Sequence, residues 1–129
     1  MYRAAGNFGG AGARYRHIEN KGRVEGASPH KLIAILFEEL LRAIDGTKIA
    51  MERNDVARQA DRQARALSIL QALDASLDRE RGGDVAANLS KIYREGRRLI
   101  AAGAREKRPD MMARARDMLG EIASAWEQI

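Results

Sequence analysis

The sequence contains no cysteine, only two prolines and few aromatic residues among its 129 positions. Without cysteine the chain forms no disulfide, no cysteine-ligated zinc site and no thiol nucleophile. It has no run of about 18 apolar residues, so we expect no direct membrane insertion. The first residues also lack the apolar core of a secretory signal. These absences predict a cytoplasmic protein whose core is mostly aliphatic.

Glycine and aromatic residues are concentrated at the N-terminus. The first 27 residues hold six of the twelve glycines and half of the aromatic residues. Glycine at this density makes a fixed helix or strand costly in backbone entropy. The same stretch carries five basic and two acidic residues, and so +3 of the net charge of +5. We predict a flexible, glycine-rich N-terminal arm over residues 1–27 and a folded domain over residues 28–129.

The folded domain shows helical periodicity and no strand pattern, and it has no proline between residues 30 and 108. Its first helix is expected to begin at Ser28-Pro29, an N-cap followed by a proline in the first turn, and to end near residue 53. A second helix is expected over about 55–79. The glycine pair at 82–83 predicts a break before a third helix capped by Asp84, and Pro109 marks the start of a fourth.

Each expected helix carries one apolar face. Four such helices joined by short breaks pack best as an all-α, antiparallel, up-down-up-down four-helix bundle. The residues predicted to face the core include Leu36, Leu40, Val56, Leu70, Val85, Leu89, Ile92 and Trp126.

No set of residues points to catalysis, a metal or another cofactor. His17 lies in the arm and His30 in the first turn of the first helix, and neither has a second metal ligand at helical spacing. Glu38 and Glu39 are adjacent carboxylates, but Glu38 precedes Arg42 by four residues, the spacing of a surface ion pair. We therefore predict that the protein is not an enzyme.

The basic residues do not form a nucleic-acid footprint. Arg94, Arg97 and Arg98 lie opposite the apolar stripe of the third helix, where a solvated face is expected. Acidic residues interrupt them, and no aromatic residue is interleaved for base stacking. Nucleic acid is not predicted as a partner.

The first helix has more apolar residues than one buried face needs. Ile35 and Ile49 point almost opposite to the core face, Leu41 lies at its edge, and Ile69 is a similar outlier on the second helix. Apolar residues on the outside of a small bundle are typical of a groove that receives a partner's amphipathic helix. Pattern alone thus indicates a helical bundle that binds another helix or itself, as a monomer or a weak homodimer.

Five stretches of the chain form a recognisable set in this order: VEGASPHKLI at 24–33, LFEE at 36–39, ALSILQALDASLD at 66–78, GGDVAANLSKIY at 82–93 and AW at 125–126. Together they resemble the flagellin-specific export chaperones of the FliS family, and the resemblance covers residues 15–129. Tyr15 corresponds to a tyrosine that precedes the first helix in that family. One departure follows Tyr93, where the family commonly has Asp-Tyr-Met and this chain has Arg94-Glu95-Gly96.

The resemblance implies a cytosolic chaperone that binds the disordered C-terminal segment of flagellin, prevents premature polymerisation and delivers flagellin to a component of the flagellar type III export gate. It also implies an N-terminal lid, for which we select Tyr15 and Ile18. The alternatives are a generic helical adaptor or regulatory homodimer unrelated to flagella and, less favoured, a nucleic-acid-binding bundle. The residues expected to form the flagellin groove are Ile35, Leu41, Ile49, Ile69 and Tyr93.

Overall fold

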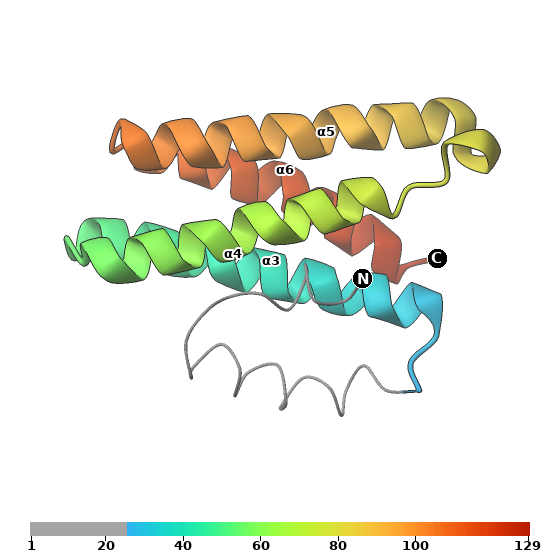
Figure 1. Cartoon of the computed structure of the whole chain (residues 1–129), viewed down its shortest axis with the longest axis horizontal. Coiled ribbons are helices and arrows are strands. Elements are labelled where there is room, and N and C mark those ends of the chain that lie inside the picture. Colours follow the sequence, from blue (N-terminus) through green and yellow to red (C-terminus); the bar gives the residue numbers. More distant parts are fainter. Residues whose placement is uncertain (1–25) are drawn as a thin grey trace.

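The computed structural model describes residues 26–129, which form four helices and no strand (Figure 1). The all-α prediction is confirmed. Tyr15 and Ile18 lie outside the described residues, as does nearly all of the expected arm. The helices are α3 (Pro29–Glu52), α4 (Val56–Ala75), α5 (Arg79–Arg105) and α6 (Pro109–Glu127).

Short polar side chains set where the helices begin. The side chains of Ser28, Asp55 and Asp78 each accept a hydrogen bond from the backbone N–H three residues later, at 3.1, 3.1 and 3.0 Å. This satisfies one of the N–H groups that the first turn of a helix leaves without a partner. Pro29 and Pro109 occupy the first turns of α3 and α6, where the missing N–H of proline costs nothing.

Two helices end on residues in the left-handed conformation, Asn54 with φ 56° and Lys107 with φ 54°. The N–H of the next residue then donates to the carbonyl five residues back, at 2.9 Å after α3 and 2.8 Å after α5. The connections from α3 to α4 and from α5 to α6 therefore turn within a few residues, which places the helices that they join antiparallel. Asparagine tolerates this conformation, whereas lysine adopts it at a cost.

The start of α5 contains one helical turn that was not predicted. This turn begins at Arg79, capped by Asp78, and it precedes Gly83, whose φ of 49° and ψ of −124° lie outside the helical range. Glycine alone takes such a backbone conformation readily, so the glycine pair interrupts the helix, and the long part of α5 follows it. The predicted break before the third helix is therefore confirmed.

The four helices form a closed ring around one core. α3 packs against α4 and α6, and α5 packs against the same two helices, so each helix contacts two neighbours along its length (Figure 1). The chain runs up and down through the ring, as predicted for an antiparallel four-helix bundle. The largest fully buried hydrophobic side chains come from all four helices: Leu40, Ile44, Leu70, Leu73, Leu99, Ile100, Met112 and Leu119.

The inward face in the first part of α5 differs from the predicted one. Val85 is 67% exposed, and Leu89 and Ile92 are only half-buried, whereas Ala86 and Ser90 on the adjacent face are buried. At the start of α4, Val56 is 76% exposed, because it lies in the first turn beside the connection from α3. The assignments of Val56 and Val85 to the core are therefore wrong.

Small residues let α5 approach α6 closely. A Cβ atom added to Gly96 would lie 3.0 Å from Leu119 Cδ1, and one added to Gly103 would lie 3.2 Å from both the backbone oxygen of Arg108 and Met111 Cβ. Both glycines are buried. Their missing side chains are thus part of the packing between the two helices.

A buried ion pair joins α3 to α4. Arg65 Nη2 donates to Glu39 Oε1 at 3.0 Å, and both side chains are about nine-tenths buried. The other carboxylate oxygen of Glu39 accepts from Arg42 at 2.9 Å on the exposed side of α3. Glu39 thus lies between two arginines, one inside the bundle and one at its surface.

A reciprocal contact joins the beginning of α3 to the end of α6. The indole N–H of Trp126 donates to the carbonyl of His30 at 2.9 Å, and His30 Nε2 donates to the carbonyl of Trp126 at 3.0 Å. The two rings are stacked, with centroids 4.7 Å apart. Of the residues assigned to the core, Leu40 and Leu70 are fully buried, whereas Leu36 and Trp126 are only half-buried at this end of the bundle.

Candidate partner-binding surface

Three of the five predicted groove residues are buried in the free bundle. Ile35 is 4% exposed, Ile69 3% and Tyr93 4%. The helical-wheel placement of Ile35 and Ile69 on the outside is therefore wrong, because α3 and α4 bury wider arcs than one apolar stripe. Ile69 and Tyr93 belong to the continuous core, whereas Ile35 is buried outside that cluster.

The environment of Tyr93 explains its burial. Its ring lies against Phe37, with centroids 6.5 Å apart in a tilted arrangement. Burial raises the pKa of the Tyr93 hydroxyl to about 12, and the negative charge of Asp74 adds to this effect. Tyr93 anchors the middle of α5 to the core.

Leu41 and Ile49 are the predicted groove residues that reach the surface. Leu41 is half-buried, and Ile49 is 45% exposed on the last turns of α3. Both belong to α3, so the structure does not bring them together with Tyr93 on one open face. An exposed isoleucine is common on a protein surface, and its function must be tested by substitution.

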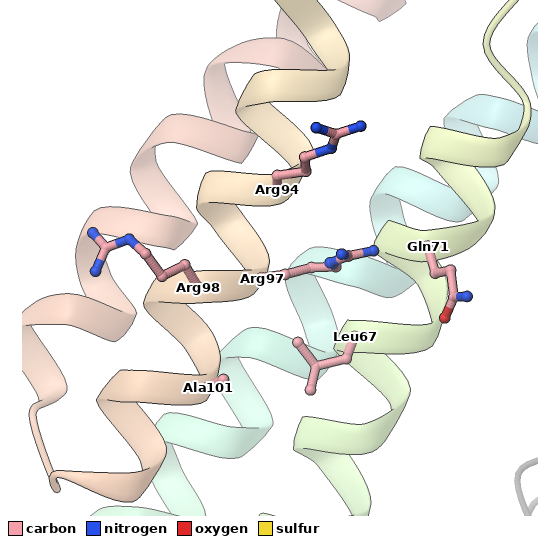
Figure 2. Close-up of a pocket in the computed structure, with 6 residues that line it drawn as sticks. All are labelled: Leu67, Gln71, Arg94, Arg97, Arg98 and Ala101. Atoms are coloured by element: carbon pink, nitrogen blue, oxygen red, sulfur yellow. The ribbon is translucent and has the colours of Figure 1, made fainter.

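An open groove of about 500 Å³ lies between α4 and α5 (Figure 2). Leu67 and Gln71 line it from α4, and Ala101 lines it from α5. Leu67 and Ala101 are half-buried, so the groove has an apolar floor that solvent reaches. Its volume falls within the range of about 300–1,000 Å³ that is typical of ligand-binding clefts.

Three arginines of α5 complete the lining: Arg94, Arg97 and Arg98. Arg97 extends from α5 across Leu67 toward Gln71, and Arg94 extends into the same space one turn away, whereas Arg98 points away from α4 (Figure 2). The sequence pattern had placed these side chains on a plain solvated face. They border a groove because Leu67 and Gln71 of α4 line the same space between the two helices.

The three arginines differ in their ion pairing. Arg98 forms a two-pronged pair with Glu95 at 2.8 and 2.7 Å, and this hydrogen bonding lowers the pKa of the Glu95 carboxyl. Within residues 26–129, neither Arg94 nor Arg97 forms an ion pair or a side-chain hydrogen bond. The groove therefore presents two uncompensated positive charges above an apolar floor.

The described part of the chain shows neither a metal-ligand cluster nor a membrane-spanning helix. Residues 26–129 do not bring three or more histidine, aspartate or glutamate side chains together as metal ligands. Within the same residues, no helix has both the length and the apolarity needed to cross a membrane. The groove between α4 and α5 and the exposed residues of α3 are thus the surfaces to consider for a partner.

Comparison with known proteins connects this bundle to a characterised family. The model of the family described as Flagellar protein FliS matches residues 11–129. The chain is 34% identical to the flagellar secretion chaperone FliS of Salmonella typhimurium, with 89% of this chain and 86% of that protein covered. It is 30% identical to the protein of the same name from Vibrio cholerae, with 89% and 85% covered. It is 27% identical to the flagellar secretion chaperone FliSB of Pseudomonas aeruginosa, with 90% and 92% covered.

Proposed function

Because the chain belongs to the FliS family of flagellar proteins, we propose that it binds the disordered C-terminal segment of flagellin and keeps flagellin from polymerising before export. The named relatives are flagellar secretion chaperones and not enzymes, and this chain is an export chaperone of the same family. The observation that carries the proposal is the family match over residues 11–129. Membership in a flagellar family also argues against an adaptor unrelated to flagella.

The bundle supports this function physically. A disordered segment that folds on binding must offset an ordering cost of roughly 2–5 kcal/mol or more, so it needs extended apolar contact. The exposed Ile49 and the half-buried Leu41 of α3, together with the open groove between α4 and α5, offer such contact. Amphipathic helices of the segment lie along these surfaces, in the manner of other helix-in-groove complexes.

We assign the predicted groove residues two different roles in this proposal. Leu41 and Ile49 contact the segment directly, because their side chains reach the surface. Ile35, Ile69 and Tyr93 support the surface from beneath, since each is less than a tenth exposed. Direct contact with these three requires a local rearrangement of α3, α4 or α5.

Two further steps belong to the same proposal. The loaded chaperone delivers flagellin to a component of the flagellar type III export gate. Before flagellin arrives, the N-terminal arm covers part of the apolar surface as a lid, with Tyr15 and Ile18 as its apolar contacts. A lid of this kind lowers the apparent affinity by the fraction of time it is closed, and it protects exposed apolar surface from aggregation.

Titration with the C-terminal segment of flagellin encoded in the same genome tests the proposal. We expect the full chain to bind the segment, and Ile49→Asp to weaken binding while the helical circular dichroism is unchanged. Val56→Asp is a matched control, because Val56 is also an exposed apolar residue, 76% exposed at the start of α4. Absence of binding by the unaltered chain would refute the proposed function. Equal losses in the two variants would remove Ile49 from the binding surface.

The lid is tested separately by deleting residues 1–19. Binding of the flagellin segment should be retained or strengthened, because a competing intramolecular contact is removed. A large loss of affinity would contradict the lid and would show that the arm contributes contacts to the complex.

A further inference from the structure

The groove between α4 and α5 combines an apolar floor with positive charge. Leu67 and Ala101 form an apolar floor, the guanidinium group of Arg97 extends over Leu67 from α5, and Arg94 lines the groove about one turn away (Figure 2). Arginine is also enriched, with aromatic residues, at the centres of protein interfaces. Since neither guanidinium has an ion-pair partner within residues 26–129, the lining attracts negative charge to an apolar surface.

The spacing of the two arginines matches the surface of a helix. Arg94 and Arg97 are three residues apart on α5, so their Cβ atoms lie about 5–6 Å apart. Carboxylates three or four residues apart on a partner helix have the same separation. The lining of α5 runs from residue 94 to residue 101, which spans about 10 Å along the helix axis. A partner helix of two turns fits this length.

We infer that the groove receives a helical segment of the export substrate that carries acidic residues one turn apart beside an apolar side chain. The apolar side chain rests on Leu67 and Ala101, and the carboxylates pair with Arg94 and Arg97. This inference rests on the proposed function, because it names the part of the substrate that this groove selects. It adds a chemical requirement, acidity, that the apolar contacts of α3 do not impose.

The charge of the chain makes its own N-terminal arm a poorer match than an acidic helix. Residues 1–25 contain five basic and two acidic residues, so they carry a net charge of +3, which the arginines repel.

Nucleic acid is also a poorer match than an acidic helix. The groove lining contains no aromatic residue on which a base stacks, and Glu95 places a negative charge beside Arg98. Residues 26–129 carry 18 basic and 16 acidic side chains, so the bundle lacks the strong positive field of a phosphate-binding surface.

A double-mutant cycle on both partners tests the inference. The chaperone is prepared as the full chain and as Arg94→Gln/Arg97→Gln. The control is Arg53→Gln/Arg58→Gln, which removes the same charge from two exposed arginines outside the groove lining. The flagellin C-terminal segment is prepared unaltered and with each Asp and Glu changed to Asn and Gln. Each pair is titrated by fluorescence anisotropy at two salt concentrations, after circular dichroism has verified the helix content.

We expect Arg94→Gln/Arg97→Gln to weaken binding of the unaltered segment about tenfold, which corresponds to ~1.4 kcal/mol. The control variant changes affinity less than twofold. The neutralised segment binds the unaltered chaperone about tenfold more weakly than the unaltered segment does. It binds the unaltered chaperone and Arg94→Gln/Arg97→Gln with equal affinity, because the carboxylates that would pair with the arginines have been removed. The difference in affinity for the unaltered segment between the unaltered chaperone and Arg94→Gln/Arg97→Gln also shrinks at high salt.

Three results would overturn the inference. If the segment binds but the groove variant retains its affinity within twofold, the groove does not select acidic residues and the proposed function stands. If the segment binds none of the chaperones, the proposed function fails and the inference fails with it. If a 20-nucleotide single strand binds the chain in an Arg94- and Arg97-dependent manner while segment binding does not depend on them, the groove belongs to nucleic acid.

Discussion

The buried ion pair of Glu39 and Arg65, which joins α3 to α4, allows the loss of stability in a variant to be predicted. In Arg65→Met the carboxylate of Glu39 stays inside the bundle and keeps only the exposed Arg42 at 2.9 Å. Removal of one partner from a buried pair costs about 3–5 kcal/mol, and we expect ~3 kcal/mol because Arg42 still compensates part of the charge. At about 4 °C per kcal/mol for a domain of this size, the melting temperature falls by roughly 12 °C.

Replacement of both partners should cost less than replacement of one. In Glu39→Leu/Arg65→Met no buried charge remains at this position, and apolar side chains of similar length fill the space. We expect the double variant to recover about 2 kcal/mol relative to the sum of the single variants, a coupling typical of residues in direct contact. Urea denaturation followed by circular dichroism gives all four free energies of unfolding.

The exposed pair of Arg98 and Glu95 provides the control. Its shortest N–O distance is 2.7 Å, shorter than the 3.0 Å of the buried pair, but both side chains are at least 40% exposed. Arg98→Met should therefore change stability little, because water replaces the lost partner. If Arg65→Met costs no more than Arg98→Met, burial does not determine the strength of these pairs and the reasoning is refuted.

Three further predictions concern α5 and the connection after it. Gly103→Ala should destabilise the bundle by about 1–2 kcal/mol because the new Cβ meets a backbone oxygen and Met111 Cβ at 3.2 Å. Gly96→Ala should cost less, since its neighbour is the end of the Leu119 side chain and not the backbone; equal costs in urea denaturation would contradict this. Stability should fall between pH 10 and about 12, because the hydroxyl of Tyr93 loses its proton near pH 10 when unfolded and only near pH 12 when folded, and Tyr93→Phe should flatten this part of the stability curve against pH. Lys107→Gly should raise the free energy of unfolding by about 0.5–1 kcal/mol, because glycine adopts φ 54° without steric cost; an unchanged melting temperature would count against strain at this residue.

Local signals in the sequence are sufficient to predict the helix boundaries that depend on neighbouring residues. Ser28 and Pro29 begin α3, and Pro109 begins α6, because a cap or a first-turn proline acts through the backbone next to it. Gly83 was recognised as an interruption for the same reason. The helical turn that begins at Arg79, before this interruption, was not predicted.

The faces of the helices were predicted less well than their ends. Ser90 and Ala86 are buried although neither is strongly hydrophobic, because α5 packs closely through small residues. Val85 is exposed because it lies just after the kink, away from the core. A helical wheel assigns the buried face of a helix from the hydrophobicity of its residues. It therefore cannot identify a face that is buried because its residues are small.

The candidate site depends on contacts between helices, which one sequence does not reveal. Arg94 and Arg97 were visible as charges, but their place beside Leu67 follows only from the packing of α5 against α4. Likewise, the sequence pattern paired Arg42 with Glu38, and Arg42 contacts Glu39, whose second partner comes from α4. The family resemblance identified the class of protein, and the structure identified which of its side chains are available to a partner.

The contact between His30 and Trp126 also has a kinetic consequence. These residues are 96 positions apart, whereas the other three seams of the ring join helices that follow one another along the chain. Closure of a loop this long carries a chain-entropy cost with a length-dependent part of about 4 kcal/mol, so we expect α3 and α6 to meet after the local hairpins of helices have formed. The stacked rings and their two hydrogen bonds thus hold together the two packed helices that the chain connects least directly.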